Sequence, residues 1–131
     1  MIPLHRFAKY NGLSLSQFLK KTEIDEIVKS TMVGGATLTK LLGTSAWYAP
    51  GASIAYVVDS ILNNQNRIIP SSVYLEGEYG VDDICIGVPC IIGKQGVVEI
   101  VELDLNQEEK SLLSNSVDAV RKMNESLGEH I

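Results

Sequence analysis

Apolar side chains between residues 33 and 62 recur at helical spacing. Leu38, Leu41 and Leu42 mark one apolar face, and a second face follows after residue 50, formed by Ile54, Val57, Val58, Ile61 and Leu62. This pattern predicts two helices that each bury one face. Pro50 suits the first turn of the second helix, where a missing N–H costs least, or a kink in that helix. We expect the small residues between the helices to place the Thr44 and Ser45 hydroxyls beside a ligand.

The first of these helices is expected to begin near Thr22. Thr22 is a good N-cap residue, and Asp25 stands at the capping-box position three residues later. An apolar stripe then continues at helical spacing through Ile24, Ile27, Val28 and Met32. Two glycines at 34–35 interrupt it, so the helix either bends there or passes through.

The first twenty residues have a different pattern. Residues 2–10 favour an extended strand, because Pro3 disfavours the helical region for Ile2. Asn11 and Gly12 form a strong turn signal. A short apolar segment follows between Leu13 and Leu19, and we interpret it as a turn of helix.

Residues 67–103 contain three β-type runs separated by turn signals. The runs cover 67–79, 84–92 and 97–103, and their short connections predict an antiparallel meander. Pro70 and Pro89 are expected at an edge, a bulge or a strand end, since proline cannot donate to a ladder. Arg67 follows the second helix and is expected to cap its end or to lie on the surface.

The last helix is expected after Asn106, with Glu109 completing a capping box and Gly128 as the stop. Its apolar face repeats through Leu113, Val117, Val120, Met123 and Leu127. Helices and antiparallel strands are largely segregated, so the predicted class is α+β, with long helices packed on an antiparallel sheet. At 131 residues, the chain is expected to form a single domain over 1–131.

Charge and hydropathy exclude several kinds of partner. The net charge is −5, and the basic pairs Lys20-Lys21 and Arg121-Lys122 stand isolated, so nucleic acid is not expected as a partner. Apolar runs are too short to span a bilayer, and the opening residues do not resemble a signal peptide. We therefore expect a cytoplasmic protein with no membrane partner.

The sequence offers little chemistry of its own. Cys85 and Cys90 would lie on opposite faces of one strand, so we expect two small buried apolar side chains without a disulfide or metal site. His5 is interpreted as an exposed polar residue rather than a general base. Trp47 and Tyr48 are interpreted as core aromatics rather than ligand stackers. No catalytic residue or metal ligand is predicted. We expect the chain to supply only part of an active site.

Several motifs in order resemble one family. They are Met1-Ile2-Pro3-Leu4, Asn11-Gly12, Gly34-Gly35-Ala36, Gly43-Thr44-Ser45-Ala46-Trp47-Tyr48-Ala49-Pro50-Gly51-Ala52, Tyr74-Leu75-Glu76-Gly77-Glu78-Tyr79-Gly80, Gly87-Val88-Pro89, Ile92-Gly93 and Gly96. Together they resemble the C-terminal, substrate-binding domain of NAD-dependent malate dehydrogenases of the lactate dehydrogenase-like type. The resemblance covers nearly the whole chain.

The resemblance implies the reaction of that family, but the residues that carry out its chemistry are not among those of this sequence. In that family a histidine in a Gly-Gly-His-Gly-Asp segment moves a proton, arginines hold the substrate carboxylates, and a Rossmann domain binds NAD. None of these is present here, so catalytic residues are not expected. By the same resemblance, Ser45 and Ala46 line the substrate pocket near C2, and Pro50 lies beside the nicotinamide ring. Ala46 and the Tyr-Ala-Pro sequence favour malate over lactate.

The resemblance also implies partners. An N-terminal Rossmann domain would complete the site, homo-oligomer contacts would cover parts of the helices, and NAD would bind the parent enzyme rather than this chain alone. Two alternatives stay open. The chain could be a free-standing, non-catalytic domain that associates with full-length dehydrogenase subunits. It could also be a small-ligand binding module that uses residues 44–50.

Overall fold

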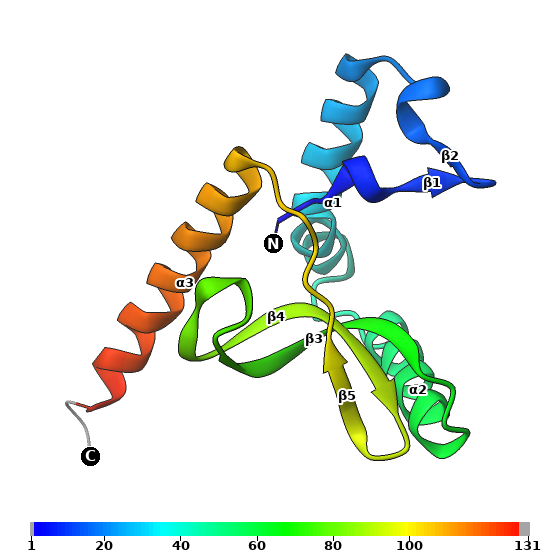
Figure 1. Ribbon diagram of the computed structural model, residues 1–131. Helices are drawn as coiled ribbons and strands as arrows, with labels where there is room; N and C mark the ends of the chain where they lie inside the picture. The colour runs from blue at the N-terminus through cyan, green and yellow to red at the C-terminus, as the bar shows by residue number, and fades with distance from the viewer. Residues whose placement is uncertain (1, 129–131) are drawn as a thin grey trace. The chain divides into compact units, whose positions relative to one another are not determined.

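The computed structural model describes residues 2–128 (Figure 1). Met1, which belongs to the first of the family motifs, lies outside the described residues. The chain divides into two compact units, residues 1–49 and 50–131. Each unit is described by itself below.

The first unit opens with short elements rather than a long strand. These are the 3₁₀ turn η1 (His5–Phe7), strands β1 (Lys9–Tyr10) and β2 (Leu13–Ser14), and the 3₁₀ turn η2 (Leu15–Gln17). The predicted strand over 2–10 is therefore wrong except at its end. The Phe7 N–H donates to the Leu4 carbonyl at 3.0 Å, which closes a turn instead. The Asn11-Gly12 turn is confirmed, with φ values of 48° and 83°.

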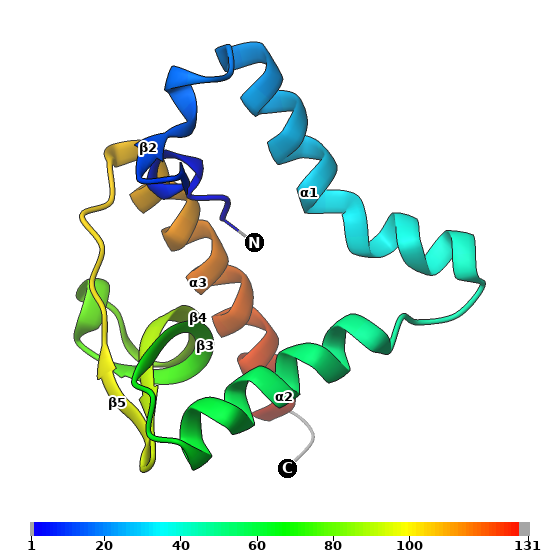
Figure 2. The same ribbon diagram turned by 90° about the vertical axis from the view of Figure 1, so that its right-hand side faces the viewer.

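Helix α1 (Lys21–Leu42) begins two residues earlier than predicted. Lys20 is its N-cap, and the Lys20 N–H donates to the Glu23 carboxylate at 2.7 Å. The Glu23 side chain therefore pairs the backbone N–H of Lys20, the residue just before the helix, and the expected cap at Thr22 is wrong. The helix passes through Gly34 and Gly35, and Figure 2 shows that it bends in its cyan middle part. Gly43 then ends it with a φ of 70°.

The apolar faces of α1 and of α2 (Tyr48–Leu62) are largely exposed, against prediction. Ile24 is buried at 8%, whereas Leu41 is 79% exposed and Ile54 64%. Other exposed members of the predicted faces are Ile27, Met32, Leu38, Leu42, Val58 and Leu62. Periodicity shows which face of a helix is apolar, but it does not show whether the surface that covers it belongs to the same chain.

The second unit is built on the three-stranded antiparallel sheet β3-β4-β5, formed by Arg67–Glu76, Asp82–Gly93 and Gly96–Ile100. The predicted meander is confirmed. Alternate residues of β3 and β4 face the core of this unit. The core is completed by Leu105 and by two side chains of α3. Its buried apolar residues are Ile69, Leu75, Ile84, Ile86, Val88, Cys90, Ile92, Leu105, Leu113 and Val117. This alternation confirms that the two cysteines face opposite sides, since Cys85 is exposed and Cys90 is buried. The expectation that both are buried is therefore wrong for Cys85, because the face opposite the core is open to solvent.

Both prolines lie inside strands and pair with each other across β3 and β4. Pro70 is on the edge strand β3, as predicted. Pro89 lies within the central strand β4, so its predicted place at an edge, a bulge or a strand end is wrong. The Pro89 carbonyl accepts the Val101 N–H at 2.8 Å, just beyond the last β4–β5 pair at Cys90 and Ile100. Its missing N–H therefore falls where the ladder has already ended.

Helix α3 (Gln107–Gly128, Figure 1) contacts β4, and Leu113 and Val117 in its first half are buried. The predicted capping box is confirmed: Glu109 N–H donates to Asn106 Oδ1, and Asn106 N–H donates to the Glu109 carboxylate, both at 2.9 Å. Beyond the buried Val117, Met123 is 68% exposed. Across residues 2–128 no helix combines the length and apolarity needed to cross a membrane.

Candidate functional site

The loop between α1 and α2 holds two of the three predicted site residues. It starts at Gly43, whose left-handed backbone ends α1 and redirects the chain. Ser45 is exposed and Ala46 is half-buried, and both lie in backbone without regular structure. Trp47 and Tyr48 are 71% and 89% exposed, so their interpretation as core aromatics is wrong.

This loop carries no acid or base. Residues 43–50 contain hydroxyl, aromatic and small side chains but no Asp, Glu, His, Lys, Arg or Cys. A Ser45 hydroxyl without an adjacent base is a hydrogen-bonding group, not an activated nucleophile. The arrangement can line a ligand pocket, but it cannot move a proton or form a covalent intermediate.

Pro50, the third predicted residue, belongs to the second unit. It is exposed and occupies the third position of α2, so its predicted place in the first turn is confirmed. An N–H at this position has no partner within the helix, which is why proline is tolerated. Its pyrrolidine ring therefore presents a rigid apolar surface at the start of α2.

The opposite end of α2 is fastened to the sheet. Ser60 is fully buried, and its hydroxyl donates to the Ile92 carbonyl on β4 at 2.7 Å. The Arg67 N–H donates back to the Ser60 Oγ at 3.4 Å. Leaving these buried groups unpaired would cost about 1–3 kcal/mol. A small hydroxyl residue at position 60 therefore joins α2 directly to β4.

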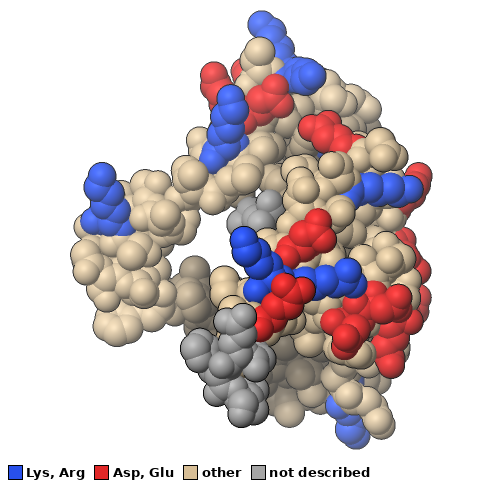
Figure 3. All heavy atoms as spheres, turned by 90° about the vertical axis from the view of Figure 1, so that its left-hand side faces the viewer, with Lys and Arg blue, Asp and Glu red and all other residues tan. Residues whose placement is uncertain are grey.

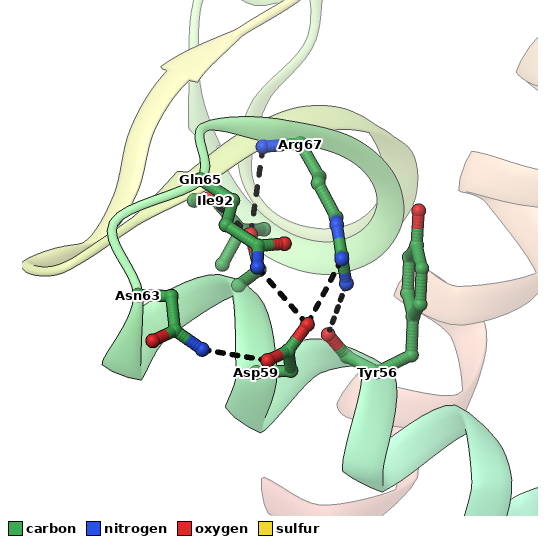
Figure 4. A network of polar contacts seen from close by, with 7 residues as sticks. Tyr56, Asp59, Asn63, Gln65, Arg67 and Ile92 are labelled. Carbon is green, nitrogen blue, oxygen red and sulfur yellow. Dashed lines mark hydrogen bonds and ion pairs between the residues drawn. The ribbon is translucent and has the colours of Figure 1, made fainter.

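A polar network surrounds this junction (Figure 4). The Arg67 guanidinium lies 2.9 Å from the Asp59 carboxylate and donates to the Tyr56 carbonyl at 3.3 Å. It also lies 4.2 Å from the centre of the Tyr56 ring. Asn63 and Gln65 donate to the same carboxylate at 2.6 and 3.1 Å. The predicted role of Arg67 at the helix end is confirmed, and the network fixes the direction in which α2 leaves the sheet.

No candidate metal centre is found among residues 2–128. Both thiols are free, and burial raises the pKa of the Cys90 thiol. His5, the one histidine in the described range, lies in the exposed turn η1, as expected for a polar surface residue. Sequence reasoning passed over Gly43, which ends α1, and Ser60, which joins α2 to β4, because a single glycine or serine carries no motif.

Comparisons with known proteins agree with one another. Residues 3–130 match the family model described as lactate/malate dehydrogenase, alpha/beta C-terminal domain. Among curated relatives, the malate dehydrogenase of Flavobacterium johnsoniae is 65% identical over 97% of this chain, and that of Parabacteroides distasonis is 61% identical over 98%. The chain spans 41% of the length of each of these relatives.

Solved structures show the same fold. The malate dehydrogenase from Salinibacter ruber superposes with a TM-score of 0.95 at 41% identity, covering 98% of this chain and 42% of that one. A lactate dehydrogenase from Eimeria maxima, solved with NADH and oxamate, gives a TM-score of 0.92 at 41% identity, covering 97% of this chain and 41% of that one. The α+β class is confirmed. The chain belongs to the lactate/malate dehydrogenase family and corresponds to its alpha/beta C-terminal domain.

Proposed function

We propose that this chain works as the C-terminal, substrate-binding part of a malate dehydrogenase that interconverts malate and oxaloacetate with NAD. The observation that carries the proposal is the similarity to malate dehydrogenases at 60% identity and above, over 97–98% of this chain but 41% of their length. The proposed location of this enzyme is the cytoplasm. We treat residues 1–131 as one functional domain of that enzyme.

In this proposal the chain lines the substrate pocket and contributes no reacting group. Ser45 and Ala46 line the substrate pocket near C2, and Pro50 borders the nicotinamide ring. The exposed, uncharged loop and the rigid ring at the start of α2 support such roles. Proton transfer, carboxylate binding and NAD binding belong to a Rossmann domain and adjoining segments that this sequence does not contain. The isolated chain is therefore inactive and does not hold NAD.

The exposed helical faces support the proposed partners. Leu41, Ile54 and Leu62 are 79%, 64% and 75% exposed although each belongs to a regular apolar stripe. Apolar stripes of this kind mark surfaces that another body covers. We assign that role to the N-terminal domain of the parent enzyme and to other subunits of a homo-oligomer.

The first experiment measures the native polypeptide in the source cells by immunoblot and intact mass. A species of more than twice 14.3 kDa with NADH-dependent oxaloacetate reduction is expected. A 14.3 kDa species that co-purifies with full-length dehydrogenase would replace the proposal by the alternative of a non-catalytic associating domain. Turnover by residues 1–131 alone would contradict the assignment of the chemistry to other segments.

The pocket-wall assignment has a separate test in the active enzyme. Ala46→Val adds two methyl groups to the wall and should lower kcat/KM for oxaloacetate about 10-fold or more, because a misfit of one methylene costs about 1–3 kcal/mol. Ala119→Val on exposed α3 is the matched control and should leave kcat/KM unchanged. Equal kcat/KM values for the two variants would remove Ala46 from the pocket.

A further inference from the structure

Basic side chains are concentrated at the beginning of this acidic chain. Residues 1–22 hold four of the 11 basic side chains, Arg6, Lys9, Lys20 and Lys21, and no Asp or Glu. All 16 acidic side chains follow residue 22. Figure 3 shows several acidic side chains adjacent to one another on the face that it presents. The first 22 residues therefore form a positively charged segment within a chain of net charge −5.

The fold of the first unit gathers most of this charge around one cavity. The cavity has a volume of about 670 Å³ and lies between η1, η2 and the start of α1. Its polar lining includes His5, Arg6, Ser14, Ser16, Lys20 and Lys21. Asp25 is the acidic side chain in the lining, so cationic groups are in excess. A volume of several hundred cubic ångströms is that of a small-molecule site.

Side chains rather than the end of α1 make this cavity cationic. The Lys20 N–H already donates to Glu23, whose carboxylate offsets the positive helix end. The Arg6 guanidinium lies 4.1 Å from the centre of the Phe7 ring, a cation–π contact that restricts its position. The Ser14 and Ser16 hydroxyls are hydrogen-bonded to each other at 3.0 Å, so one donates to the other and the second O–H group is left to donate to a ligand. Two separate segments, 5–6 and 20–21, thus present cations to the same space.

We propose that this cavity binds a small multivalent anion through Arg6, Lys20 and Lys21, with one hydroxyl of the Ser14–Ser16 pair donating a hydrogen bond. Phosphate and carboxylate oxygens suit these groups, since guanidinium and ammonium donors form charge-assisted hydrogen bonds with both. A polyphosphate or a polycarboxylate places several such oxygens within one cavity. The site lies apart in sequence from the 43–50 loop and is independent of the proposed dehydrogenase function.

The test titrates the native-length polypeptide with sodium pyrophosphate and, separately, with citrate, by isothermal titration calorimetry. Saturable binding with a Kd below about 1 mM is expected for at least one probe. The stronger probe identifies the source, phosphate or carboxylate. The double variant Lys20→Gln/Lys21→Gln should raise the Kd at least 10-fold, while Lys20→Arg/Lys21→Arg should keep it within about 3-fold, because charge is retained.

Lys94→Gln/Lys122→Gln is the matched control, since it removes two positive charges away from the cavity lining and should not change the Kd. The lysines at 20 and 21 are exposed, so the variants should fold, as checked by circular dichroism. Absence of binding, or equal weakening in the control, overturns the proposal. If neither probe binds but Lys20→Gln/Lys21→Gln dissociates an oligomer, the cations face the acidic surface of a second copy instead.

Discussion

Tyr79 shows how much one side chain does in the second unit. It lies in a tight turn with a φ of 57°, an unusual backbone for a bulky residue. Its N–H donates to the Glu102 carboxylate at 2.6 Å, and its hydroxyl donates to the Val101 carbonyl at 2.7 Å. The same hydroxyl accepts the Leu103 N–H at 3.0 Å. One phenol therefore holds the segment that leads from β5 to α3.

Replacing Tyr79 by Phe should destabilise the fold by about 1–3 kcal/mol, because it leaves two partly buried backbone groups unpaired. Urea unfolding at pH 7 measures the loss. Tyr48→Phe is the control, since the Tyr48 side chain is 89% exposed. Equal stabilities for the two variants would contradict the role given to the Tyr79 hydroxyl.

Tyr79 also predicts a pH dependence. Burial raises the pKa of this phenol above its ordinary value of 10.0, since the charged phenolate is disfavoured there. The folded state then holds its proton at a pH where the unfolded state has lost it. Stability is therefore fully present below pH 10.0 and declines as the pH rises towards the folded pKa. The decline between pH 9.5 and 11, measured by urea unfolding, should be shallower in Tyr79→Phe than in the parent chain.

At the scale of elements, the capping box of α3 is a local device with a measurable share of stability. Its two reciprocal hydrogen bonds close the start of the helix that covers the sheet. Asn106→Ala should cost about 1 kcal/mol in unfolding free energy. Asn115→Ala at an exposed position inside the same helix is the control and should be neutral or slightly stabilising, since alanine is the better helix former. Urea unfolding measures the free energy of unfolding of both variants. If Asn106→Ala were as stable as Asn115→Ala, the capping box would not contribute to stability.

At the glycine pair in α1, substitution by alanine is expected to increase stability rather than to lower it. A Cβ at Gly34 or Gly35 would meet no other atom within 4 Å in this structure. Gly34→Ala should therefore stabilise α1 by about 1 kcal/mol, provided that only this chain surrounds it. Thermal unfolding of the chain measures this effect. Loss of stability or of assembly in the native-length protein alone would show that another body approaches α1 closely at the glycines.

At the scale of the whole molecule, the exposed apolar stripes of α1 and α2 dominate the expected behaviour. Hydrophobic residues that are more than half exposed on these two helices include Ile27, Met32, Val33, Leu41, Leu42, Ile54 and Leu62. A chain of 14.3 kDa should self-associate at micromolar concentration in order to cover them. Sedimentation velocity measures this directly. A single monomeric boundary across the micromolar range would contradict the expectation.

Leu41→Glu/Ile54→Glu should shift that distribution towards the monomer, because each change places a charge within an apolar stripe. Leu112→Glu is a matched control on the other long helix, where the leucine is 43% exposed. It should leave the sedimentation profile unchanged. Equal effects from the control would indicate non-specific charge repulsion rather than a contact through α1 and α2.

The sequence by itself determined the features that depend on near neighbours. The Asn11-Gly12 turn, the first-turn position of Pro50, the Asn106–Glu109 capping box and the opposite faces of Cys85 and Cys90 all follow from backbone rules that act over a few residues. The ordered motifs also predicted the family and its α+β fold. The observed N-cap of α1, Lys20, precedes the predicted N-cap, Thr22, by two residues. The Lys20 N–H donates to the Glu23 carboxylate, and the sequence alone did not show that this contact would form instead of a Thr22 cap.

Only the tertiary structure decided the features that depend on partners distant in the sequence. It placed Pro89 inside the central strand, and it joined Ser60 to Ile92 and Tyr79 to Val101. It also gathered Arg6, Lys20 and Lys21 around one cavity and left the apolar stripes of α1 and α2 exposed. Helical periodicity specifies that a face is apolar, whereas burial depends on the body that meets it. Most of both stripes is exposed in this structure, so the apolar pattern alone did not predict their burial.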